Sequence, residues 1–125
     1  MRTTLQDAGV EITLSSTPLN KIHVRITVSY NFVVAYQMHW IDFKLSTDEF
    51  ENMVECLVSG KKSKHGNRSI WGANLLKIKD KSYPSQPFTD VCIYKRTFIL
   101  GFFWVPAAFS SKLLREISNL KGAFR

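Results

Sequence analysis

Strict alternation of apolar and polar residues marks residues 21–30 as a β-strand. The apolar positions share one face and the polar positions share the other: Ile22, Val24, Ile26 and Val28 against His23, Arg25, Thr27 and Ser29. The second set is polar and partly cationic, so this face of the sheet is expected to contact water. A turn at Asn31 and a second strand over residues 33–45 follow, which predicts an antiparallel pair. Before them we expect a frayed segment over residues 1–9 and a short edge strand at residues 11–14.

The clearest helix signal lies at residues 47–59. Ser46 is a preferred N-cap residue, and Glu49 follows at the position that completes a capping box. Apolar side chains then recur at helical spacing: Phe50, Met53, Val54 and Leu57. Gly60 stands where helices commonly end. The pattern therefore predicts a helix that packs one apolar stripe against the strands.

The second half of the chain predicts a similar arrangement of strands and a helix. Alternation at residues 70–79 indicates a strand, and the turn-rich residues 80–88 indicate a surface loop. Residues 91–105 predict one long bent strand or a hairpin that turns near Lys95 and Arg96, with a bulge at Gly101. Pro106 is expected in the first turn of a last helix. Residues 1–125 thus predict a single α+β domain, with an antiparallel sheet and two helices in approximate ββα–ββα order.

Hydropathy and cysteine content favour a cytoplasmic protein. No uninterrupted apolar run reaches the roughly 18 residues that a membrane helix needs, and residues 1–7 lack the apolar core of a signal peptide. We therefore expect a soluble chain with no membrane partner. Cys56 and Cys92 are expected to be reduced core thiols. The histidines, His23, His39 and His65, lack metal-ligand spacing, so neither a metal nor another cofactor is expected.

Charge is distributed unevenly along the chain, whose net charge is +7. Residues 1–60 hold four Lys and Arg against seven Asp and Glu, whereas residues 61–125 hold thirteen against three. Such asymmetry is typical of proteins that bind a polyanion. The most basic segment is a predicted loop at residues 61–68, which carries Lys61, Lys62, Lys64 and Arg68.

These cations predict a nucleic-acid-binding site in which the loop binds phosphates. Flanking contacts are expected from Arg25, Trp71, Lys77 and Lys79. Trp71 could stack on a base or pack in the core, and Tyr36 and Trp40 are further stacking candidates. No predicted helix carries the Arg, Asn and Gln cluster that reads the major groove, so nonspecific or single-strand binding is favoured over base readout. The alternative is a solvated hairpin tip whose lysines serve solubility alone.

Two other functions remain open from the sequence. A metal-independent nuclease could use His65 beside Lys64 and Arg68, but only the residue types support it, and we expect no enzyme. A small inhibitor or adaptor that binds another protein, such as a nucleic-acid enzyme, would also need no catalytic group. Residues 98–105 are expected to form the central core strand, or otherwise a partner groove or a dimer seam. The acidic and basic halves could also associate in a homodimer.

Overall fold

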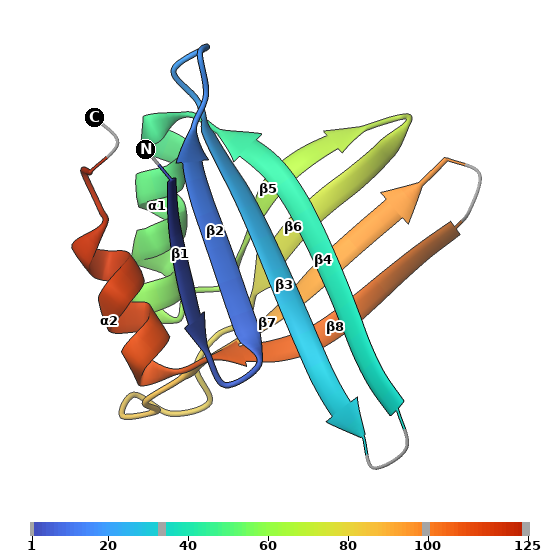
Figure 1. Ribbon diagram of the computed structural model, residues 1–125. Helices are drawn as coiled ribbons and strands as arrows, with labels where there is room; N and C mark the ends of the chain where they lie inside the picture. Colours follow the sequence, from blue (N-terminus) through green and yellow to red (C-terminus); the bar gives the residue numbers. More distant parts are fainter. Residues whose placement is uncertain (1, 33–34, 99–100, 124–125) are drawn as a thin grey trace.

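The computed structural model describes residues 2–32, 35–98 and 101–123. They form two four-stranded antiparallel sheets, each followed by a helix (Figure 1). The first sheet and its helix comprise β1 (Arg2–Asp7), β2 (Val10–Ser16), β3 (Ile22–Phe32), β4 (Ala35–Leu45) and α1 (Thr47–Ser59). The second sheet and its helix comprise β5 (Ser63–Ser69), β6 (Gly72–Ile78), β7 (Thr89–Thr97), β8 (Gly101–Phe109) and α2 (Ser111–Asn119). Within each sheet the strands pair in sequence order.

The predicted single sheet in ββα–ββα order is therefore wrong, because each half of the chain places four strands before its helix. Two strands were missed in the sequence. β1 lies within the segment expected to be frayed, and β5 covers most of the predicted basic loop at residues 61–68. Both are edge strands, which tolerate polar and charged residues on both faces. Their sequences consequently lack the apolar alternation that marks β3.

β1 changes the place of β2 in the first sheet. It pairs with β2 along its whole length, from Arg2 opposite Ser15 to Asp7 opposite Val10. β2, which was expected to be a short edge strand, is therefore an interior strand with a fully buried inner face. The first sheet gains enough width to cover both helices.

The segment at residues 91–105 is a hairpin, as one of the two interpretations proposed. β7 and β8 pair antiparallel from Thr89 opposite Phe109 to Thr97 opposite Gly101. The turn lies beyond Thr97, so the expected turn near residues 95–96 is wrong. Gly101 begins β8 with a φ of 84°, a left-handed conformation that glycine adopts without strain.

Pro106 lies within β8 and does not begin a helix. It is tolerated there because β8 is an edge strand, where a missing N–H need not interrupt the ladder. The last helix begins at Ser111, and the side chain of its N-cap Ser110 accepts a hydrogen bond from the N–H of Leu113 at 3.2 Å. Phe109 is the last residue of β8 and is fully buried.

Residues 98–105 are not the central core strand, because β8 lies at the edge of its sheet. Phe102 and Trp104 are 66% and 58% exposed, whereas Val105 is buried. Residues 99 and 100 lie outside the described residues. The apolar bulk that suggested a core strand is thus divided between the core and the surface.

α1 has the predicted bounds and the predicted capping box. The hydroxyl of Ser46 accepts a hydrogen bond from the N–H of Glu49 at 3.2 Å, and Glu49 Oε1 accepts one from the N–H of Ser46 at 2.9 Å. Gly60 ends the helix in a left-handed conformation with a φ of 69°. Local sequence alone therefore determined this element.

One hydrophobic core joins both sheets and both helices. The two helices lie on the same side of the first sheet and pack against each other (Figure 1). Each sheet turns one face towards this core, and its most deeply buried side chains include Ile12, Ile26, Phe50, Leu76 and Phe109. We call these the inner faces of the two sheets. The opposite, outer faces are free of helices and carry most of the exposed strand side chains.

Candidate nucleic-acid interface

Strand register arranges the outer face of the second sheet in three rows that cross all four strands. The first row joins Lys64, Lys77, Cys92 and Pro106. The second joins Gly66, Leu75, Tyr94 and Trp104. The third joins Arg68, Ala73, Arg96 and Phe102. Cations therefore gather on the β5 and β6 side of this face, and aromatic rings gather on the β7 and β8 side.

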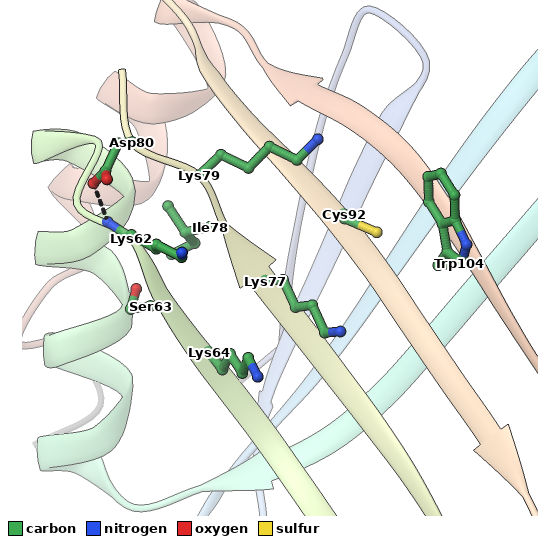
Figure 2. A pocket seen from close by; sticks show the side chains of 9 residues that line it. All are labelled: Lys62, Ser63, Lys64, Lys77, Ile78, Lys79, Asp80, Cys92 and Trp104. Carbon is green, nitrogen blue, oxygen red and sulfur yellow. Dashed lines mark hydrogen bonds between the residues drawn. The ribbon is translucent and has the colours of Figure 1, made fainter. Parts of the chain in front are cut away.

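Four lysines border a hollow on the cationic side. Lys62 and Lys64 come from the β5 edge, and Lys77 and Lys79 come from β6 and its end, as Figure 2 shows. The hollow has a volume of about 560 Å³, and Trp104 lines its far side. Such a volume lies within the range of small-ligand sites. Its lining offers positive charge along one side and an aromatic ring on the other.

Asp80 also lines this hollow, but its single negative charge does not balance the four lysines. The carboxylate of Asp80 accepts a hydrogen bond from the backbone N–H of Lys62 at 2.7 Å (Figure 2). This bond fixes the chain where it enters β5 and so positions the lysines that follow. Four lysines and one aspartate at the hollow leave a clear excess of positive charge. Phosphate groups are the natural counter-charge for such a site.

The aromatic side presents exposed rings beside the lysines. Phe102 and Trp104 alternate with buried residues along β8, and Tyr94 lies opposite Trp104 on β7. The ring centroids of Tyr94 and Phe102 are 6.0 Å apart, and the amine of Lys77 lies 4.4 Å from the Tyr94 centroid. This cation–π contact joins the basic and aromatic sides. Leu75 is buried beneath them and gives the face an apolar floor.

The row that contains Phe102 continues to the tips of both hairpins. Trp71, between β5 and β6, is 70% exposed, and its ring centroid lies 5.3 Å from that of Phe98. A guanidinium nitrogen of Arg96 donates a hydrogen bond to the carbonyl oxygen of Ser69 at 2.6 Å, which ties the two hairpins together near the tip. Trp71 is therefore a surface residue, and the alternative of core packing is wrong.

Most of the predicted site residues lie on this one face or at its end. These are Lys62, Lys64, Arg68, Lys77, Lys79 and Trp71. Lys64, Arg68 and Lys77 stand on the paired strands β5 and β6, so the predicted flexible loop is wrong and these cations have fixed spacing, whereas Lys62, Trp71 and Lys79 lie just beyond the strand ends. Lys61 precedes β5, and its N–H donates to the carbonyl of Cys56 at the end of α1.

Arg25 does not belong to this face. It lies on the outer face of the first sheet, where its guanidinium is 3.4 Å from a carboxylate oxygen of Asp42. Trp40 lies in the register position next to that pair on the same face. The side chain of Tyr36 lies outside what the structure describes.

Sequence reasoning missed four residues of the face: Tyr94, Arg96, Phe102 and Trp104. Their positions do alternate along β7 and β8, so a period-two pattern could have assigned them to one face. The signal was masked because apolar residues occupy both faces of β8. Trp104 faces outward and Val105 faces inward, but both are large apolar residues in the sequence, although only Val105 is buried.

The structure separates the groups that a nuclease would need together. His65 lies on the inner face, is buried, and has its Nε2 atom 2.9 Å from Ser63 Oγ. Burial lowers the pKa of His65 from its ordinary value. Lys64 and Arg68 alternate with it and project from the opposite face. No three His, Cys, Asp or Glu side chains among the described residues gather where a metal ion could bind.

The cysteines are both free and buried. Cys92 lies on the floor of the hollow, and burial raises the pKa of its thiol, against the opposing effect of Lys77 and Lys79. A buried thiol with a raised pKa is a poor nucleophile. The hollow is therefore suited to binding and not to thiol chemistry.

Comparison with known proteins gives no assignment, since no protein-family model and no curated protein sequence matches the chain. Neither helix in the described part of the chain has the length and apolar character required to cross a membrane.

Proposed function

We propose that this protein binds single-stranded nucleic acid on the outer face of its second sheet and performs no catalysis. The observation that carries the proposal is the pairing of a lysine cluster with exposed rings on one face, joined by the contact between Lys77 and Tyr94. Lysines beside aromatic platforms are how many proteins hold a single strand, since phosphates bind the cations and bases stack on the rings. Lys64, Phe102 and Trp104 complete this arrangement.

Single strands suit this face better than duplex. A ring can stack only on a base that is unpaired or at an end, and Phe102 and Trp104 offer broad exposed surfaces for that contact. Duplex readout would instead need a helix or ribbon with Arg, Asn or Gln aimed at base edges. The only polar side chains that we identify on α2 for such a role are Lys112, Arg115 and Asn119. Binding should therefore depend weakly on sequence.

The test is fluorescence anisotropy with labelled single- and double-stranded oligonucleotides. Between about 50 and 200 mM salt, four phosphate contacts would weaken single-strand binding about 50-fold. Trp104→Ala should weaken it by about 5- to 150-fold, the range expected for one stacked base. Lys77→Ala should weaken it evenly across sequences and reduce the salt dependence. Lys112→Ala, on α2, is the matched control. Absence of binding at the lower salt concentration would refute the proposal.

A second candidate function is a small inhibitor or adaptor that binds another protein, such as a nucleic-acid enzyme. It is favoured by the apolar cluster at the hairpin tips, where Ile70, Trp71 and Phe98 are 77%, 70% and 66% exposed. Exposed apolar clusters of this kind often dominate protein interfaces. For this function Trp71→Ala should abolish capture of the partner, whereas Lys77→Ala should have little effect. The opposite ranking is expected for nucleic acid on the sheet face.

The compartment that we propose is the cytoplasm. Both cysteines are free and buried, which suits a reducing environment. Fractionation of cells that express the tagged chain tests this assignment. Recovery in the membrane or secreted fraction would contradict it.

A further inference from the structure

The two tryptophans that end up on outer faces occupy equivalent positions in the two sheets. β4 and β8 are each the last strand of a sheet, and each runs through an N-cap serine, Ser46 or Ser110, into a helix. Trp40 lies six residues before Ser46, and Trp104 lies six residues before Ser110, so the two tryptophans occupy equivalent positions. Trp40 also faces outward, opposite Thr27 of β3. The first sheet therefore repeats the aromatic position that is central to the proposed interface.

The equivalence is visible in a direct contact between the sheets. His39 and Phe103, the residues before the two tryptophans, also match each other, and their ring centroids lie 5.4 Å apart. The last strands of the two sheets therefore approach one another at this point (Figure 1). Trp40 and Trp104 each adjoin one ring of that pair. Because side chains alternate along a strand, Trp40 and Trp104 point away from this contact, on the outer faces of different sheets, so a polymer chain that reached both would have to pass around the edges of β4 and β8.

Trp40 is available for contact and has a cation beside it. Its side chain is 42% exposed, and that of the neighbouring Met38 is 50% exposed. The amine of Lys95, which comes from the second sheet, lies 5.5 Å from the Trp40 ring centroid. A cation thus lies over an aromatic ring at two places, although Lys95 belongs to the inward-facing row of β7 whereas Lys77, which lies over Tyr94, is on the outer face of the second sheet.

Basic residues also occur on the outer face of the first sheet, although less densely. Arg2, His23 and Lys44 lie in one row of the register, and Arg25 lies in the next row. A hollow of about 400 Å³ opens between Arg2, Arg25 and Met38. Asp42 lies 3.4 Å from Arg25 and 3.7 Å from His23, and Glu11 also faces this side, so part of the positive charge is balanced. This face should bind an anionic strand more weakly than the second sheet does.

We infer that the outer face of the first sheet, centred on Trp40, is a second and weaker contact site for the same single strand. The inference rests on the proposed function of the second sheet. Once a strand is long enough to pass around the sheet edges, binding at Trp104 would hold its free end near Trp40 at a raised effective concentration, so a weak contact would add measurably to affinity. Short strands would occupy the second sheet alone, and longer strands would contact both sheets.

The experiment measures affinity for unstructured oligothymidines from about 5 to about 30 nucleotides, spanning the usual site sizes of single-strand binders. Protein is kept below the oligonucleotide concentration so that one molecule binds each strand. Trp40→Ala and Met38→Ala are compared with Trp104→Ala and with the control Leu19→Ala, a highly exposed turn residue. Circular dichroism and urea midpoints establish that each variant is folded. Indole N–H signals, assigned through Trp→Phe variants, report contact at each tryptophan.

Trp40→Ala is expected to leave short-strand affinity unchanged and to reduce long-strand affinity by about 5-fold or more, since base stacking sets this scale. Trp104→Ala should reduce affinity at every length. The Trp40 indole signal should shift only with long strands. Equal long-strand affinity for Trp40→Ala and wild type, with an unmoved Trp40 signal, would overturn the inference while leaving the proposed function intact. If only Trp104→Ala reduced affinity, at every strand length, the inference would likewise be overturned and the proposed function would stand. If wild type bound no oligonucleotide, both the inference and the proposed function would be refuted.

Discussion

The side-chain amide of Asn67 pairs with the backbone of Lys44 in the manner of a neighbouring strand. Its Oδ1 atom accepts a hydrogen bond from the Lys44 N–H at 2.8 Å, and its Nδ2 atom donates one to the Lys44 carbonyl at 3.0 Å. β4 is the edge strand of the first sheet, so these backbone groups have no strand beside them. One asparagine thereby joins β5 of the second sheet to the edge of the first.

Asn67→Ala is expected to lower the free energy of unfolding by about 1–2 kcal/mol, because it removes two hydrogen bonds at a surface position. Urea denaturation followed by circular dichroism measures the change. Asn67→Asp keeps the acceptor and loses the donor, so it should fall between alanine and wild type. Asn119→Ala, at the end of α2, is the control and should change stability little. Equal midpoints for Asn67→Ala and wild type would show that the bridge contributes nothing to stability.

The capping box of α1 should contribute a pH-dependent part of the stability. The hydrogen bond from the backbone N–H of Ser46 lowers the pKa of Glu49 below its ordinary value. A carboxylate with a lowered pKa stabilises the folded state above the unfolded pKa, and this contribution is lost as the pH falls through the folded pKa. Ser46→Ala should cost about 1 kcal/mol at pH 7, because the N–H of Glu49 loses its acceptor. Glu49→Gln should also cost stability at pH 7, and that cost should shrink as the pH falls through the folded pKa of Glu49 and its carboxylate is protonated.

Urea titrations of wild type, Ser46→Ala and Glu49→Gln at pH 7 and at acid pH measure these differences. Glu49→Gln, which keeps a hydrogen-bonding side chain without the charge, should be less sensitive to pH than wild type. A cost of Glu49→Gln that is constant across this range would contradict the role of the ionised Glu49. Ser110→Ala provides a comparison at a cap without a glutamate partner.

Elements set by local chemistry could be predicted from the sequence, whereas elements set by neighbouring strands could not. α1 was correct because Ser46, Glu49 and Gly60 specify both of its ends. The lysines and Gly66 of β5 have low strand propensity and predict a loop, and only its pairing with β6 makes it a strand. Pro106 was assigned to a helix because nothing local shows that β8 is an edge strand.

The same distinction applies to the candidate site. Lys62, Lys64, Lys77 and Lys79 could be selected from charge density alone, and the structure brings them together. Trp104 could not be separated from the core, because the face of an apolar strand depends on which partners cover it. The pairing of Lys77 with the Tyr94 ring depends on the register between β6 and β7, which residue types do not specify.

Burial of His65 should make the protein less stable in mild acid. Its lowered pKa means that the unfolded chain binds a proton more readily than the folded chain. The contribution of this histidine is therefore fully present above its unfolded pKa of about 6.5 and is lost as the pH falls below that value. Wild type should lose stability between about pH 7 and pH 5, before the carboxylates are titrated.

Urea midpoints at several pH values in this window measure the loss. His65→Gln has no titrating group at this position and should lose less stability over the same range than wild type. His23→Gln is the matched control, because it removes a partly exposed histidine and keeps His65. A pH dependence that is identical in wild type and His65→Gln would exclude His65 as its source.

Gly66 distinguishes the observed strand from a flexible loop. Its φ is 139°, and a Cβ atom there would lie 2.1 Å from the carbonyl oxygen of Asn74 on the paired strand β6. Gly66→Ala should therefore destabilise the fold by more than about 1 kcal/mol, since the native conformation cannot accept a side chain. It should also weaken single-strand binding, because β5 carries Lys64 and Arg68 on the proposed face. Gly101→Ala is the control, because Gly101 also has a positive φ but an added Cβ there would meet no atom of the described residues within 4 Å. A Gly66→Ala variant as stable as this control would show that residues 63–69 are not held as a strand.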